Sequence, residues 1–246
     1  MVRFSCPSDL VQALATAGGI DAAVETGTFR GEGTLVLREA VSKVWTVELS
    51  SELYERAVRR FGHRPGITVL HGSSDEMLPE LAAVINEPVL FWLDAHGGMV
   101  DMAASEVYNP AGEATQCPVI AELHAIRQFP HVARSCVLID DARAFLAPLP
   151  HHRAADWPSL LEIIDLLRGD ADRYITILDD VIIAVPMALR EVVDHWWLDQ
   201  LEYREGRDGH EQKLWDAYNP TPGIAVRRLV KSLTPRTVRR LYDRHR

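Results

Sequence analysis

Cysteine, positive charge and long apolar runs are all scarce in this chain of 246 residues. The three cysteines, Cys6, Cys117 and Cys136, are odd in number and far apart, which fits neither a disulfide framework nor a CxxC zinc or redox motif. We therefore expect a reducing, cytoplasmic location. The formal net charge of -9 and the pI near 5.6 argue against the broad positive field of nucleic-acid-binding proteins, so we expect no nucleic-acid partner.

No segment approaches the roughly 18 apolar residues that span a bilayer, so we expect no transmembrane segment. The first residues also lack the apolar stretch behind a basic start that marks a signal peptide. What the chain does have is a globular composition, with 47% apolar and 25% charged residues. Its length suits one large core, so we predict a main domain over residues 1–186 and a helical extension over residues 187–246.

Short β-rich runs alternate with amphipathic helical stretches. Strands are predicted at Asp21–Glu25, Val44–Glu48, Ile67–Leu70, Val89–Asp94 and Ser135–Ile139. Helices are predicted at Glu32–Val41, Ser51–Phe61, Asp75–Ile85, from about Cys117, and at Pro158–Leu167. This alternation indicates an α/β fold with a parallel sheet and right-handed crossovers. The carboxyl ends of the strands, and any ligand site, should gather at one edge of that sheet.

Two further apolar runs, Tyr174–Leu178 and Val181–Val185, have the pattern of a tight hairpin, because only the polar pair Asp179 and Asp180 separates them. The last strand should therefore run antiparallel and complete a Rossmann-like, doubly wound sheet. We assign no chemistry to the two turn aspartates.

The first predicted strand leads into a glycine-rich turn. Residues 25–34 read Glu-Thr-Gly-Thr-Phe-Arg-Gly-Glu-Gly-Thr and pass from a strand into a helix. Glycines let backbone approach a ligand, and the helix N-terminus offers unpaired N–H groups. Such turns also carry glycines for geometry alone. Glu48 ends the next strand about twenty residues beyond Gly27, where an acidic group binds the ribose hydroxyls of a nucleoside.

Each of these polar strand ends also has a structural alternative. Glu48 is close enough to the helix that begins near Ser51 to cap it. Ser73 and Ser74, after the third strand, are placed either to meet an adenine edge or to cap the helix that follows.

The charge and spacing of the turn favour S-adenosylmethionine (AdoMet) over a nicotinamide cofactor. Gly27, Gly31 and Gly33 do not have the G-x-G-x-x-G spacing that seats a pyrophosphate. Glu25 would repel a diphosphate, whereas a carboxylate suits a cofactor that carries an ammonium and a sulfonium.

A cluster of aspartates is predicted where the fourth and fifth strands end. Asp94 ends one, and Asp140 and Asp141 end the other, so neighbouring strands would bring three carboxylates together. Their mutual repulsion calls for a neutralising cation. All-oxygen ligands favour Mg²⁺, with Ca²⁺ or Mn²⁺ as alternatives. The competing interpretation is that these aspartates cap helices or pair with Arg143.

Taken together, the acidic glycine-rich turn, the acidic second-strand tip and the antiparallel last strand resemble the class I AdoMet-dependent methyltransferases over about residues 20–185. The aspartate trio resembles the macrocin O-methyltransferase type, which methylates sugars and natural products. This resemblance implies a seven-stranded sheet and a divalent metal such as Mg²⁺ on Asp94, Asp140 and Asp141. The implied cofactor contacts are Glu25, Thr26, Gly27, Thr28, Gly31, Thr34, Glu48, Ser73, Ser74 and Asp94.

The chain departs from related enzymes in two respects. No lysine of the kind that catechol-type enzymes use as a base lies near Asp94, and the segment 97–115 is an insertion of this chain's own. His96, in a polar glycine-rich loop two residues beyond Asp94, and Asp94 itself are the candidate bases that take the proton of a metal-bound hydroxyl. His96 has two alternative roles, as a metal ligand or as a simple loop residue. We expect segments 97–115 and 144–156 to form the acceptor pocket.

The predicted function is metal-dependent O-methylation of a sugar, glycoside or related polyhydroxylated small molecule. The alternatives are metal-independent methylation and a non-catalytic, cofactor-binding scaffold. The C-terminal segment inverts the charge of the body with eight basic residues: Arg227, Arg228, Lys231, Arg236, Arg239, Arg240, Arg244 and Arg246. Such a tail suits a solvated helix, a homo-oligomer contact, or a peripheral contact with anionic lipid or an acidic partner.

Overall fold

The computed structural model describes residues 6–96, 99–101, 106–108, 116–147, 152–169 and 172–208. The chain divides into two compact units after Trp196, and helix α8 (Arg190–Asp208) crosses that boundary. The first unit carries the fold and every candidate site residue. The domain boundary expected at residues 186 and 187 stays a prediction.

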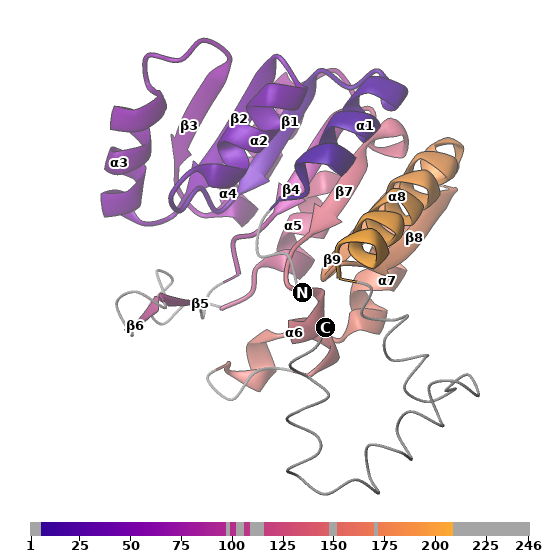
Figure 1. The fold of residues 1–246 in the computed structure, drawn as a ribbon. Coiled ribbons are helices and arrows are strands. Elements are labelled where there is room, and N and C mark those ends of the chain that lie inside the picture. The colour runs from indigo at the N-terminus through magenta and orange to yellow at the C-terminus, as the bar shows by residue number, and fades with distance from the viewer. Residues whose placement is uncertain are drawn as a thin grey trace, which may run out of the picture. The chain divides into compact units, whose positions relative to one another are not determined.

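A seven-stranded sheet forms the centre of the first unit (Figure 1). Its strands are β1 (Ala22–Thr26), β2 (Lys43–Glu48), β3 (Ile67–His71), β4 (Val89–Leu93), β7 (Cys136–Ile139), β8 (Arg173–Leu178) and β9 (Val181–Pro186). Their spatial order is β3-β2-β1-β4-β7-β9-β8. The five predicted parallel strands are confirmed to within a residue or two at each end. Two short strands, β5 (Met99–Asp101) and β6 (Glu106–Tyr108), pair separately and were not predicted.

The last strand is antiparallel, as predicted. It lies between β7 and β8 and runs against both. Asp179 and Asp180 form the two-residue turn and have φ values of 51° and 71°. Positive φ at both positions is typical of the hairpin turns whose twist matches that of the strands they join.

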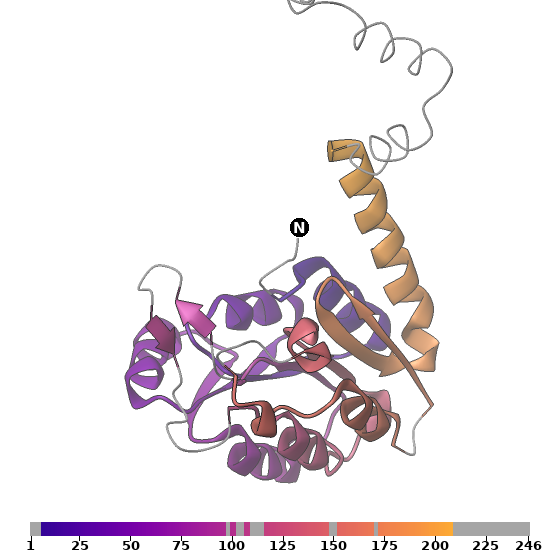
Figure 2. The ribbon, with the colours of Figure 1, turned by 90° about the horizontal axis from the view of Figure 1, so that it is seen from below.

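Helices cover both faces of the sheet (Figure 2). Helices α1 (Ser8–Gly18) and α2 (Glu32–Ala40) lie on one face, and α4 (Ser74–Val84), α5 (Val119–Ile126) and α7 (Leu160–Arg168) lie on the other. Helix α3 (Ser51–Phe61) packs against β2 and β3. Helices α1 and α6 (Ala142–Leu146) were not predicted. Short 3₁₀ turns occur at Val132–Arg134, Ala154–Asp156 and Met187–Leu189.

The core lies between the sheet and the α4, α5 and α7 layer. Strands β1, β4 and β7 are buried along their whole length, as expected of parallel strands covered on both faces. Phe91 of β4 meets Phe129 edge to face, with the ring centroids 4.9 Å apart. This packing fixes the strands whose carboxyl ends carry the candidate site.

Within the described part of the chain, no helix is long and apolar enough to cross a membrane. The helical pattern expected from Met187 is present through Asp208. The basic tail from Arg227 to Arg246 lies outside the described residues.

Candidate functional site

The predicted site residues lie at the carboxyl ends of β1, β2, β3, β4 and β7, or in the first turn of a following helix. Gly27 follows β1 with φ 86°, and a Cβ atom at this position would collide with the backbone carbonyl of Asp94. Gly31 has φ 80° and precedes α2, where a Cβ atom would collide with the ring of Phe61. Both positions therefore require glycine, because the turn lies directly against neighbouring strands and helices.

Glu48 binds this turn from the tip of β2. Its Oε2 accepts a hydrogen bond from the backbone N–H of Phe29 (2.8 Å), and its Oε1 accepts one from the N–H of Ser50 (2.9 Å). The N-cap of α3 is Ser50, whose hydroxyl accepts from the N–H of Leu53, so Glu48 does not cap that helix. Burial raises the pKa of Glu48, and the backbone amides oppose that rise. The ribose contact expected of Glu48 stays a prediction.

Glu25 lies inside the protein beneath α2. Its Oε2 accepts hydrogen bonds from the hydroxyls of Thr34 (2.5 Å) and Thr46 (2.7 Å), and only 1% of the residue is exposed. Burial raises its pKa to about 7, although the two hydroxyls oppose the rise. The Glu25 carboxylate on β1 is thus hydrogen-bonded to Thr34 of α2 and to Thr46 of β2. The cofactor contacts expected of Glu25 and Thr34 stay predictions.

The small polar residues of the site differ in their surroundings. The hydroxyls of Thr28 and Thr46 are 2.5 Å apart. Ser73 is the N-cap of α4, but its side chain makes no capping hydrogen bond, so helix capping does not explain it. Ser74 is buried, and Thr26 Oγ1 is buried without a hydrogen-bond partner.

Asp94 and Asp140 are brought together because β4 and β7 are parallel neighbours. The N–H of Asp140 donates to the carbonyl of Leu93, and the N–H of Asp94 donates to the carbonyl of Thr26. His96 lies between the carboxylates, with Nε2 3.4 Å from Asp141 Oδ2 and 4.0 Å from Asp94 Oδ1. The shorter contact lacks hydrogen-bond geometry, so we treat it as electrostatic.

Asp141 has a different role from the other two aspartates. Its backbone is left-handed, with φ 51°, and its Oδ1 receives Arg143 Nη2 at 2.6 Å. Arg143 also forms an ion pair with Asp180, whose side chain accepts from the Arg143 N–H at 2.9 Å. The alternative of pairing with Arg143 therefore holds for Asp141. Asp180 anchors the loop after β7, which is a structural role.

Burial and mutual repulsion shape the charges of this cluster. Burial and the charge of Asp140 hold the pKa of Asp94 well above its usual value, although 32% of this side chain is exposed. Burial and the charge of Asp141 raise the pKa of Asp140 to about 6. Burial disfavours the charged form of His96, but the aspartates outweigh it and raise its pKa to about 9. Asp141 is also buried, yet His96 and Arg143 lower its pKa.

These charges bear directly on the predicted metal and base. In the described residues, no three His, Cys, Asp or Glu side chains are arranged to hold a metal ion. The hard oxygen ligands suit Mg²⁺ in kind, but Asp141 is already neutralised by Arg143 and His96, so the trio as placed does not fit a cation. The aspartates raise the pKa of His96 to about 9, which favours its protonated form. The base roles expected of His96 and Asp94 stay predictions.

The predicted acceptor segments are only partly described. Of residues 144–156, the structure places 144–147 and 152–156. Asp156 Oδ2 accepts from the N–H of Gln116 at 2.8 Å, and Gln116 Oε1 accepts from the N–H of Arg153 at 2.6 Å. Trp157 stacks on His152 and meets His96 edge on, with ring centroids 4.0 and 5.6 Å apart. Residues 152–157 thus contact both His96 and Gln116, which flank the 97–115 segment.

Sequence reasoning missed Glu122. This glutamate lies on α5, is 1% exposed, and its Oε1 is buried without a hydrogen-bond partner. Its only sequence signal is its position on the apolar face of the helix, beside Val119, Leu123 and Ile126.

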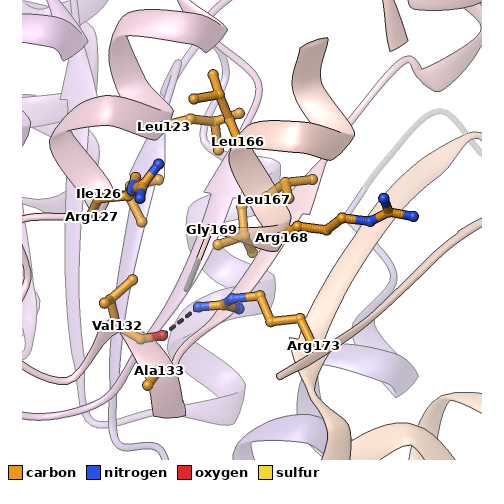
Figure 3. Close-up of a pocket in the computed structure, with 11 residues that line it drawn as sticks. Leu123, Ile126, Arg127, Val132, Ala133, Leu166, Leu167, Arg168, Gly169 and Arg173 are labelled. Carbon is orange, nitrogen blue, oxygen red and sulfur yellow. Dashed lines mark hydrogen bonds between the residues drawn. The ribbon is translucent and has the colours of Figure 1, made fainter. Parts of the chain in front are cut away.

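A separate cavity of about 230 Å³ lies at the opposite edge of the sheet. Figure 3 shows the ends of α5 and α7 and the start of β8 around it, with Arg173 donating to the carbonyl of Val132. Arg127 and Arg168 also line it, and so do apolar residues such as Leu123 and Leu167. None of the predicted site residues lies there.

No protein-family model matches the sequence, and no curated protein matches it. Solved structures do match. An O-methyltransferase from Bacillus cereus in complex with SAH (S-adenosylhomocysteine) has a TM-score of 0.50 and 14% identity over 72% of this chain and 80% of that chain. The O-methyltransferase TomG from Streptomyces achromogenes, involved in tomaymycin synthesis and in complex with SAM, has a TM-score of 0.51 and 17% identity over 75% of this chain and 82% of that chain. At these identities the likeness shows the fold.

Proposed function

We propose that this chain is an AdoMet-dependent O-methyltransferase that acts on a small hydroxylated acceptor. The observation that carries the proposal is the pairing of the Gly27 turn with Glu48 at the same edge as Asp94 and Asp140. The turn leads from β1 into the N-terminus of α2, and the buried carboxylate of Glu48 beside it suits ribose hydroxyls. The cofactors in the two similar structures support this choice of ligand.

The residues divide the chemistry between them. AdoMet supplies a methyl group on a positively charged sulfur, which the acceptor oxygen takes as S-adenosylhomocysteine leaves. We assign Asp94 the role of the base that accepts the acceptor's hydroxyl proton, because its backbone lies against the Gly27 turn at the carboxyl end of β4. His96, held protonated by the aspartates, attracts the carboxylates of Asp94 and Asp141 and so holds them in position. Positioning of the two reactants accounts for most of the rate enhancement in such a transfer.

We further propose a sugar, glycoside or similar polyhydroxylated molecule as the acceptor. The support is the group of carboxylates from Asp94, Asp140 and Asp141, which accept hydrogen bonds from several hydroxyls at once. The aromatic rings of Phe145 and Trp157 lie beside His96 and give this side of the site an apolar surface.

We also propose that the methyl transfer depends on a divalent metal, which would require the aspartates to rearrange. Asp94 and Asp140 supply hard oxygen ligands, but Asp141 would first have to leave Arg143. The metal-independent alternative has its own support, because His96 and Arg143 already neutralise Asp141. A chelator separates the two, since only the metal-dependent enzyme loses activity with EDTA and regains it with Mg²⁺.

The deciding experiment is calorimetric titration of AdoMet and S-adenosylhomocysteine into the full chain, followed by mass spectrometry of a panel of methyl glycosides incubated with AdoMet. We expect binding of both nucleosides and a gain of one methyl group on at least one glycoside. Tight binding with no transfer to any acceptor would favour the scaffold alternative. Absence of binding would reject the proposed function as a whole.

A further inference from the structure

Glu122 is a buried carboxylate on α5, and one of its oxygens, Oε1, makes no hydrogen bond. Within the described part of the chain, no lysine or arginine forms an ion pair with it. Fully buried glutamates are rare unless paired, and an unpaired buried acceptor costs free energy. Such an atom is therefore typical of a site that a ligand completes.

The neighbours of Glu122 come from the candidate nucleoside site. Helix α5 packs against α4, and the hydroxyls of Ser74 and Thr26 and the charge of His96 act on the Glu122 carboxyl. Thr26 Oγ1 and His96 Nε2 are also buried without a hydrogen-bond partner. Glu122 on α5 is thus linked to Thr26 at the end of β1, to Ser74 at the start of α4 and to His96 after β4.

The chemistry of this group complements the edge of an adenine ring. A carboxylate only accepts hydrogen bonds, whereas a serine hydroxyl both donates and accepts. The exposed edge of adenine offers an amino group that donates and a ring nitrogen that accepts. We propose that Glu122 accepts a hydrogen bond from the 6-amino group of the AdoMet adenine through Oε1, the carboxylate oxygen that lacks a hydrogen-bond partner. The proposal rests on the proposed function and extends it to a residue on α5.

This contact makes Glu122 the residue that distinguishes adenine from a 6-oxo purine. In S-inosylhomocysteine a carbonyl oxygen replaces the amino group, so two acceptors would face each other with no proton between them. A hydrogen bond to a charged group contributes enough to change affinity by about ten- to a hundredfold. Glutamine at this position carries both an acceptor and a donor, so it can bind either purine.

The test compares the dissociation constants of S-adenosylhomocysteine and S-inosylhomocysteine by calorimetry. The proteins are the full chain, Glu122→Gln, Glu122→Ala and the control Glu80→Gln, which removes an exposed carboxylate from α4. We expect the unaltered chain and the control to prefer the adenosyl compound by tenfold or more. Glu122→Gln should narrow that preference to about threefold or less, chiefly through tighter binding of the inosyl compound.

The comparison of two ligands separates specificity from folding. If Glu122 is only structural, its variants weaken both ligands by the same factor and leave the preference intact, which overturns the proposal. An unaltered preference at unaltered affinity overturns it equally. If the unaltered chain binds neither compound, the proposed function fails first, and this inference fails with it. Thermal melts of all four proteins confirm that each comparison is made on folded chains.

Discussion

Gly27 lies so close to Asp94 that a single methyl group on Gly27 would overlap the Asp94 carbonyl oxygen. The glycine-rich turn after β1 and the tip of β4 therefore form one rigid unit, in which the expected cofactor contacts and the expected base have a fixed separation.

The first prediction concerns Gly27→Ala. The new Cβ atom adds a clash with backbone to the strain of a positive φ, so we expect a loss of about 2 kcal/mol or more in unfolding free energy and at least tenfold weaker binding of S-adenosylhomocysteine. Gly19→Ala is the matched control, because Gly19 has φ 58° but nothing within 4 Å of its added Cβ. Urea unfolding and calorimetry measure both effects. Equal losses in the two variants would show that the close approach to Asp94 has no importance.

The second prediction concerns Glu48→Gln. The variant loses one of two carboxylate acceptors that hold Phe29 and Ser50, and it loses the charge expected to bind ribose. We expect S-adenosylhomocysteine to bind about ten- to a hundredfold more weakly. Glu52→Gln, at an exposed position in the first turn of α3, should leave the affinity unchanged. Retention of full affinity in Glu48→Gln would remove Glu48 from the cofactor site.

The third prediction concerns the pH dependence of stability. The pKa of Glu25 is about 7 in the folded chain against 4.5 for an exposed glutamate, so the folded state holds its proton more tightly than the unfolded state. The stabilising contribution is present below pH 4.5 and is lost as the pH rises through 7. This difference corresponds to about 3 kcal/mol. Glu25→Gln should therefore gain stability relative to the unaltered chain between pH 5 and pH 8 in urea unfolding. A constant difference across that range would contradict the raised pKa.

The fourth prediction concerns Arg143 and the metal. Arg143 competes with any cation for Asp141, since Nη2 and Oδ1 are 2.6 Å apart. If the enzyme is metal-dependent, Arg143→Ala should bind Mn²⁺ more tightly in an electron paramagnetic resonance titration, and Asp140→Asn should bind it more weakly. Arg59→Ala, an exposed change on α3, is the control. The absence of Mn²⁺ binding in the unaltered chain and in Arg143→Ala would favour metal-independent methylation.

The sheet could be predicted from sequence because its signals are local. The buried strands β4 and β7 are short apolar runs, β1 begins with three apolar residues, and the Asp179–Asp180 pair has the residue types that accept positive φ. Helix α1 was missed although Leu10, Val11, Leu14 and Ala15 have helical spacing and are buried.

The candidate site was harder to predict because its contacts join distant residues. Strand ends indicated that Asp94 and Asp140 would meet, and they do. The orientation of Asp141 depends on its left-handed backbone and on Arg143, which Asp180 holds from a turn far along the chain. Glu122 could not be distinguished from an exposed helix glutamate until its burial was known.

The position of β9 has a consequence for how the chain is made. β7 is entirely apolar, and its second neighbour in the sheet is β9, the last strand in the described part of the chain, inserted between β7 and β8. A nascent chain that ends before Val181 exposes β7 as an unprotected edge, which is the kind of surface that recruits other chains. Completion of the sheet beside Asp140 and protection from aggregation therefore occur in the same late step of synthesis.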